Sequence, residues 1–126
     1  MSQLKLDAAH NRVAPAPAAS VTAAAQAAGL PLFRIDTTQL GTKAALLAAC
    51  AQTLALPRHF GKNWDALADC LMDADWLPPS GCVLLWLGSR AFEATAPEDF
   101  AIARDVFGEA AAFWKVRGRP FHLFLD

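Results

Sequence analysis

The spacing of apolar and polar residues along the chain predicts an α/β protein. Cys82–Leu87 is a continuous apolar run that ends at Gly88, which is typical of a strand covered on both faces. Residues 30–36 and 121–125 also have the composition of strands. Because helical segments separate these strands, we expect right-handed crossovers and a small parallel sheet.

Apolar residues at helical spacing predict two helices between the strands. Over residues 42–54, the inner face is expected to consist of Leu46, Leu47, Cys50 and Leu54. Behind Thr95, a longer apolar stripe consists of Phe100, Ala103, Phe107, Ala110 and Trp114. Thr95 and Glu98 have the spacing of a capping box, with Pro97 tolerated in the first turn. Gly118 is expected to end this helix.

A third helix, from about residue 63 to residue 73, has an apolar side and an acidic side. Asn63 offers a side-chain oxygen as the N-cap. The apolar side consists of Trp64, Leu67, Ala68, Leu71 and Met72. Asp65, Asp69 and Asp73 recur every four residues on the other side, where like charges cost the helix a few tenths of a kcal/mol each. A strip that slightly destabilises its own helix indicates a surface for a positively charged partner.

The N-terminal residues differ from the rest of the chain. Residues 1–19 are rich in alanine, proline and polar residues, and we expect a mobile extension ahead of a domain over 20–126. Ser20 is expected to cap a short helix over 21–28 that Gly29 closes. The first residues contain no apolar segment of the kind found in secretory signals.

Composition narrows the classes of function. The chain has 126 residues, which suits one domain, and a net charge of -1, which identifies no partner. Any electrostatic function therefore depends on local clusters. Its three cysteines are an odd number without a Cys-x-x-Cys motif, and reduced buried thiols predict a cytoplasmic location. The longest apolar run is too short to span a membrane.

The segment 56–71 resembles the barstar family of intracellular ribonuclease inhibitors. The family pattern is present as Leu56-Pro57, His59-Phe60, Gly61, Asn63, Asp65-Ala66-Leu67 and Asp69-Cys70-Leu71. The similarity continues into Val106-Phe107 and Glu109-Ala110 and covers roughly residues 31–126. It implies a barstar-like α/β fold with three parallel strands packed against helices. It also implies a bacterial protein that has no cofactor, is not an enzyme, and is a monomer when free.

The resemblance places Asp65, Asp69 and Glu109 at a surface that binds a basic, secreted-type ribonuclease. Such an enzyme holds RNA phosphates with arginine and lysine side chains. A carboxylate held rigidly in the same pocket mimics the phosphate, and Asp69, in the middle of its helix, is the candidate for this role. The alternative for any exposed acid on a helix is that it only keeps the surface solvated.

The full set of predicted partner-binding residues is His59, Phe60, Gly61, Asn63, Asp65, Asp69, Asp73, Trp76 and Glu109. Within it, Phe60 and Trp76 also suit core packing, and Gly61 and Asn63 suit a turn and a cap. Two positions depart from the family: His59 stands where an aromatic ring is usual, and Ala68 replaces a tryptophan between the two aspartates. These departures suggest a partner other than barnase.

Two other functions are compatible with these residues. A barstar-like module that binds another basic protein without inhibiting a nuclease is the main alternative. His59, Asp65 and Asp69 would make a metal or acid–base site only with further ligands, and we expect no metal because no serine, cysteine or second histidine is placed to complete it. No phosphate-binding loop is present. Arg117 and Arg119 are too few to indicate nucleic-acid binding.

Overall fold

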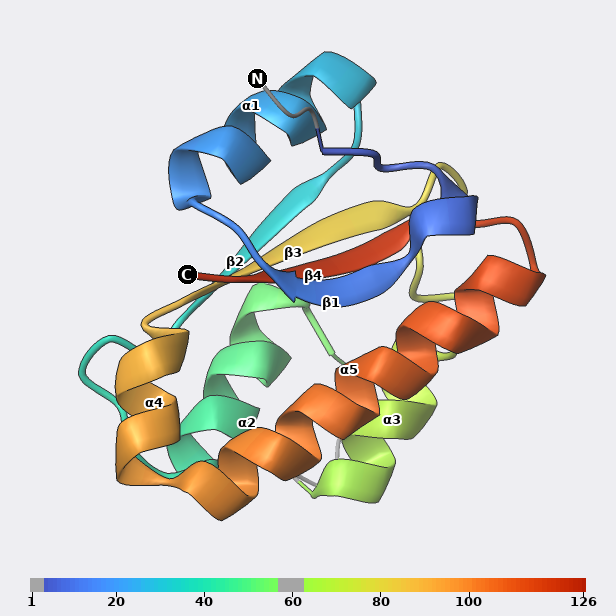
Figure 1. Cartoon of the computed structure of the whole chain (residues 1–126). Helices are drawn as coiled ribbons and strands as arrows, with labels where there is room; N and C mark the ends of the chain where they lie inside the picture. The colour runs from blue at the N-terminus through green and yellow to red at the C-terminus, as the bar shows by residue number, and fades with distance from the viewer. Residues whose placement is uncertain (1–3, 57–62) are drawn as a thin grey trace.

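Four parallel strands form the central sheet in the computed structural model, which describes residues 4–56 and 63–126. The strand order is β1-β4-β3-β2 (Figure 1). The strands are β1 (Arg12–Pro15), β2 (Leu32–Asp36), β3 (Cys82–Leu87) and β4 (Phe121–Leu125). The apolar run predicted to be a doubly covered strand is β3, which pairs with β2 on one side and β4 on the other.

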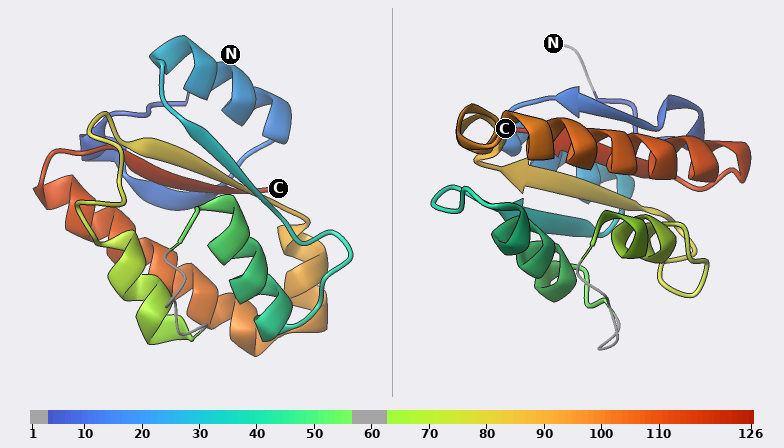
Figure 2. Two further views of the ribbon diagram at one scale, coloured as in Figure 1. Left: turned by 180° about the vertical axis from the view of Figure 1, so that it is seen from behind. Right: turned by 90° about the horizontal axis from the view of Figure 1, so that it is seen from below.

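Helices cover both faces of this sheet (Figure 2). They are the short 3-10 helix η1 (Ala8–His10), α1 (Ala18–Ala28), α2 (Lys43–Thr53), α3 (Trp64–Leu71), α4 (Ser89–Thr95) and α5 (Pro97–Val116). The helix α1 lies on one face, whereas α2, α3 and α5 lie on the opposite face (Figures 1 and 2). The chain therefore has three layers, with the sheet in the middle.

Alternate side chains of β3 enter two separate apolar clusters. Leu84 and Trp86 belong to the larger cluster, which contains the buried faces of α2, α3 and α5. Val83 and Leu85 belong to the smaller one, under α1. In the larger cluster the Trp86 ring packs 5.4 Å from that of Phe100, between ring centroids. All the residues predicted for the inner faces of α2 and α5 are buried there, at 6% exposure or less.

The sheet has four strands and not the three expected. The additional strand β1 pairs in parallel with β4, so that Arg12 lies opposite His122 and Pro15 opposite Leu125. It comes from the segment 1–19, which the composition suggested was a mobile extension. Within that segment, Leu6 is 8% exposed and packs into the cluster under α1. The strand shows no apolar alternation, and its proline is tolerated because β1 is an edge strand.

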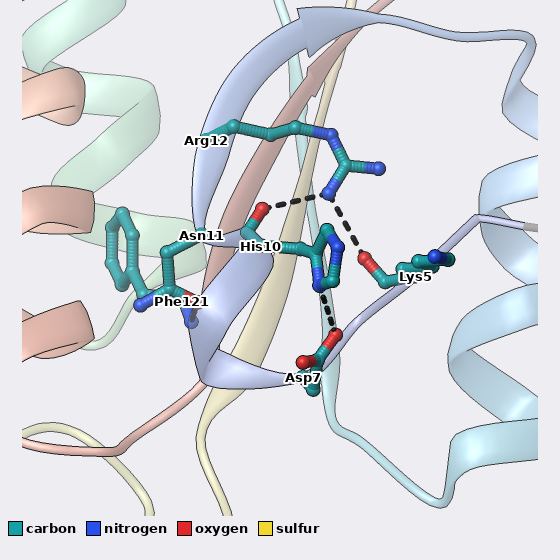
Figure 3. A network of polar contacts seen from close by, with 6 residues as sticks. All are labelled: Lys5, Asp7, His10, Asn11, Arg12 and Phe121. Carbon is teal, nitrogen blue, oxygen red and sulfur yellow. Dashed lines mark hydrogen bonds and ion pairs between the residues drawn. The ribbon is translucent and has the colours of Figure 1, made fainter.

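Asn11 connects this N-terminal segment to the far end of the chain (Figure 3). Its side-chain amide donates to the carbonyl oxygens of Ala111 (3.2 Å) and Arg119 (2.9 Å). Its side-chain oxygen accepts the backbone N–H of Phe121 at 2.8 Å. One amide therefore links the start of β1 to α5 and to the first residue of β4.

A second group of polar contacts holds the turn before β1 (Figure 3). The Arg12 guanidinium donates to the backbone oxygens of Lys5 (2.9 Å) and His10 (2.7 Å). It also lies over the ring of Phe124, 5.1 Å from its centroid. The Asp7 carboxylate and the His10 ring form an exposed contact, with 2.6 Å between Oδ1 and Nδ1.

Two predicted helix starts are wrong. Thr95 ends α4, a helix that the sequence pattern did not indicate, and α5 begins at Pro97 with Ala96 as its N-cap. No side chain caps that terminus, so the Thr95–Glu98 capping box does not form. Similarly, α1 begins at Ala18 rather than after Ser20, although Gly29 closes it in the left-handed conformation (φ 70°), as predicted.

We expect Asn11→Ala to lower the free energy of unfolding by about 3 kcal/mol, because it removes three partly buried hydrogen bonds worth about 1 kcal/mol each and leaves their partners unpaired. Gln26→Ala, which changes an exposed amide on α1, is the matched control and should change it by less than about 0.5 kcal/mol. Denaturant unfolding measures both. Equal effects would show that the N-terminal segment is not anchored through Asn11.

His122 should make stability depend on pH. Its ring is fully buried, and neither ring nitrogen has a hydrogen-bond partner among the described residues. Burial lowers the pKa of His122 below its usual value near 6.5, and the Arg12 guanidinium also lowers it, against the opposing effects of the Leu6 backbone and of Asp7. The unfolded chain therefore takes up a proton on acidification before the folded chain does, and stability falls as the pH drops below about 6.5.

The slope from one such group is at most about 1.4 kcal/mol per pH unit. Denaturant unfolding of wild type and His122→Leu between pH 5 and pH 7 isolates the contribution of His122 to this slope, because the remaining titrating groups are shared by both proteins. Parallel stability curves would contradict this account of His122.

Candidate functional site

The helix α3 begins as the sequence predicts. The Asn63 side-chain oxygen accepts the backbone N–H of Ala66 at 2.7 Å. This contact satisfies one of the free donors in the first turn and sets the start of the helix. Behind it, Leu67 and Leu71 are fully buried, whereas Asp65 and Asp69 are exposed. The apolar core therefore fixes the rotation of α3 about its axis and directs the two carboxylates to solvent.

Asp73 does not continue the acidic strip as a helical residue. The helix ends at Leu71, with Met72 as the C-cap. The Asp73 side chain accepts the backbone N–H of Asp75 at 2.8 Å, within the turn that follows. The predicted strip of three aspartates is thus two helical carboxylates and a third, also exposed, that is engaged in a turn.

Glu109 comes from α5, which packs beside α3 on the same face of the sheet (Figure 1). The indole N–H of Trp114 in α5 donates to the backbone oxygen of Leu71 at 2.8 Å, which ties the two helices together. Glu109 is exposed, and its neighbours Phe107 and Ala110 are fully buried. The structure therefore brings the three predicted carboxylates to two adjacent helices whose relative position a buried hydrogen bond holds.

These carboxylates form no ion pair within the described part of the chain. Within residues 4–56 and 63–126, the one ion pair is that of Asp7 with His10, which is far along the sequence from α3 and α5. Among the described residues, no lysine or arginine side chain forms an ion pair with Asp65, Asp69 or Glu109. A cation does approach α3: the Lys43 ammonium lies over the Trp64 ring, 5.6 Å from its centroid. The sequence pattern did not indicate this contact.

The cysteine beside the acidic residues is not an activated thiol. Partial burial raises the pKa of Cys70, and the carboxylates of Asp69 and Asp73 raise it further. Burial raises the pKa of both Cys50 and Cys82 to about 12. Because the thiolate is the nucleophile, all three thiols are poorly suited to nucleophilic catalysis.

Trp76 has a structural role that accounts for its position. Its indole N–H donates to the backbone oxygen of Leu54 at 2.9 Å. Its ring centroid lies 6.4 Å from those of Phe33 and Phe121. The side chain is half-buried, so a partner contact at its exposed edge stays a prediction.

The predicted loop residues His59, Phe60 and Gly61 lie outside the described residues. In the part of the chain that is described, no group of three or more histidine, cysteine, aspartate or glutamate side chains is arranged to hold a metal ion. Nor does that part contain a helix long and apolar enough to cross a membrane.

A protein-family model matches most of the chain. Residues 30–126 match the family model described as Barstar (barnase inhibitor). That range contains α3, α5 and all the predicted site residues. No curated protein sequence matches the chain. The fourth strand β1 and the helix α1 precede the matched range.

Loss of the Asn63 cap and loss of an exposed acid should change the free energy of unfolding by different amounts. We expect Asn63→Ala to lower the free energy of unfolding by about 1 kcal/mol, because the cap of α3 is lost. Asp69→Ala should change it by less than about 0.5 kcal/mol, because an exposed charge is removed from a strip of like charge. Denaturant unfolding compares the two. A large loss in Asp69→Ala would show that this carboxylate serves the fold.

Proposed function

The chain belongs to the barstar family, and on this basis we propose that it is an intracellular inhibitor of a ribonuclease made by the same cell. The observation that carries the proposal is the set of exposed carboxylates of Asp65, Asp69 and Glu109, which no cation in the described residues neutralises. A surface of this kind suits the cationic active site of an enzyme that binds RNA.

Asp69 is the residue that we assign to the phosphate-binding pocket of the nuclease. It lies in the middle of α3, a helix held by the Asn63 cap and by the burial of Leu71. A carboxylate on such a rigid base binds with little ordering cost. Arginine side chains that hold an RNA phosphate make equally good charge-assisted pairs with a carboxylate. Asp65 and Glu109 would bind basic residues at the rim of the pocket.

The alanine at position 68 affects which nuclease the chain binds. It is half-buried and packs against the core, so it adds little to the outer surface of α3. With alanine there, and His59 in the preceding loop, the aromatic part of the contact differs from the family pattern. We propose that this chain inhibits its own ribonuclease far better than it inhibits barnase. The loss of the aromatic group also favours the second candidate function, a module that binds a basic protein without blocking it.

Inhibition assays with Asp69→Asn test the proposal. The enzymes are purified barnase and the ribonuclease activity secreted by the cells that make this chain. We expect the variant to be at least thirtyfold weaker than wild type, equivalent to about 2 kcal/mol at a desolvated hot spot. Glu93→Gln neutralises an exposed carboxylate on α4 and is the matched control, with an expected change below threefold.

Three results would count against parts of this proposal. Unchanged inhibition by Asp69→Asn would remove Asp69 from the phosphate pocket. Binding of the nuclease without loss of its activity would favour the non-inhibitory module. Failure of the wild-type protein to inhibit either enzyme would refute the proposed function.

A further inference from the structure

The C-terminal end of α5 carries an apolar and cationic patch that the acidic site does not explain. Val116 is 84% exposed, more than the other large apolar side chains in the described part of the chain that lie open to solvent. Phe113 is half-buried, and Arg117 is exposed. Phe113, Val116 and Arg117 are here called the α5 patch.

Two side chains of the α5 patch, Phe113 and Arg117, are held in place before any partner binds. The guanidinium of Arg117 lies over the Phe113 ring, 3.5 Å from its centroid. The same guanidinium donates to the backbone oxygen of Phe113 at 3.0 Å. The Phe113 ring packs edge-on against that of Trp114, with centroids 4.9 Å apart. A surface ordered in this way loses little side-chain entropy on association.

The α5 patch is continuous with the acidic site. Glu109, Phe113 and Val116 have the spacing i, i+4, i+7, which places them within about 60° on one side of a helix. The hydrogen bond from Trp114 to Leu71 brings this end of α5 against the end of α3, two residues after Asp69. An interface of standard size that covers Asp69 and Glu109 therefore also includes the α5 patch.

We propose that Phe113, Val116 and Arg117 extend the nuclease-binding surface and determine which ribonuclease this chain recognises. The inference rests on the proposed function. The occupant is the rim of the same basic ribonuclease, with an apolar contact for Phe113 and Val116 and a carboxylate for Arg117. Aromatic and arginine side chains are enriched in interface cores, and α5 here supplies the aromatic contact that Ala68 does not.

The charge of Arg117 determines whether its reversal should weaken or strengthen binding. A purely basic partner surface would be repelled by this arginine, so its presence beside the acids calls for an acidic group on the partner at that point. Charge reversal should then weaken binding, although it makes the inhibitor more acidic overall. If the partner has no carboxylate there, the same change should strengthen binding.

The test compares charge reversal at two exposed arginines of α5 and its C-cap. Arg117→Glu alters the α5 patch, and Arg104→Glu makes the same change in net charge elsewhere on α5. The probe is the secreted ribonuclease activity of the cells that make this chain, with purified barnase in parallel. We expect Arg117→Glu to lose at least thirtyfold in inhibition of the secreted activity and Arg104→Glu to change by less than threefold.

The apolar part is tested by Val116→Ala against Ile102→Ala, which truncates the other large exposed apolar side chain of α5. We expect about a fivefold loss for Val116→Ala with the secreted ribonuclease, a smaller loss with barnase, and no loss for Ile102→Ala. Unfolding midpoints of all four variants confirm that the fold is retained.

The results distinguish this inference from the proposed function. If Asp69→Asn abolishes inhibition but Arg117→Glu and Val116→Ala match their controls, the α5 patch is outside the interface and the inference fails while the proposed function stands. A gain in inhibition by Arg117→Glu would overturn the carboxylate assignment. If wild type inhibits neither enzyme, both the proposed function and the inference are refuted.

Discussion

Burial of β3 on both faces is the constraint on which the rest of the structure depends. The five residues from Cys82 to Trp86 have no solvent exposure, so each face of the sheet must be covered. The helices α2, α3 and α5 cover the face that contains Trp86. Residues 4–29, which precede the family match, supply α1 and Leu6 to the other face and β1 to the edge of the sheet. The N-terminal segment is therefore a structural part of this fold.

The same core determines the acidic surface. Because Leu67 and Leu71 are held in the larger cluster, α3 has one orientation, and Asp65 and Asp69 lie on its opposite side. The bond from Trp114 to Leu71 then fixes α5, and with it Glu109, relative to α3. Charges on a rigid frame lose little conformational entropy when a partner binds, which is the property an inhibitor of an enzyme active site requires.

In the proposed complex, the carboxylates would attract the nuclease and the α5 patch would select which nuclease binds. In that complex, the carboxylates on α3 and α5 would attract a strongly basic enzyme over about a Debye length, roughly 10 Å at 0.1 M salt. The α5 patch acts only on contact, through an apolar surface and one arginine that Phe113 holds in place. Such a division lets one acidic scaffold serve different nucleases, because the contacts around the acids can change while the acids remain.

The sequence by itself indicated the strands β2, β3 and β4, the helices α1, α2, α3 and α5, and the apolar and acidic sides of α3. The apolar run of β3, the cap at Asn63 and the inner faces of α2 and α5 follow from local spacing, and the structure confirms each of them. Tertiary structure alone decided that β1 joins the sheet, because Arg12–Pro15 has no alternation and gains its stability by pairing with β4 and through Asn11. It also decided that Asp73 leaves the helical strip and that α5 packs beside α3 through Trp114, since contacts between residues distant in sequence leave no local pattern.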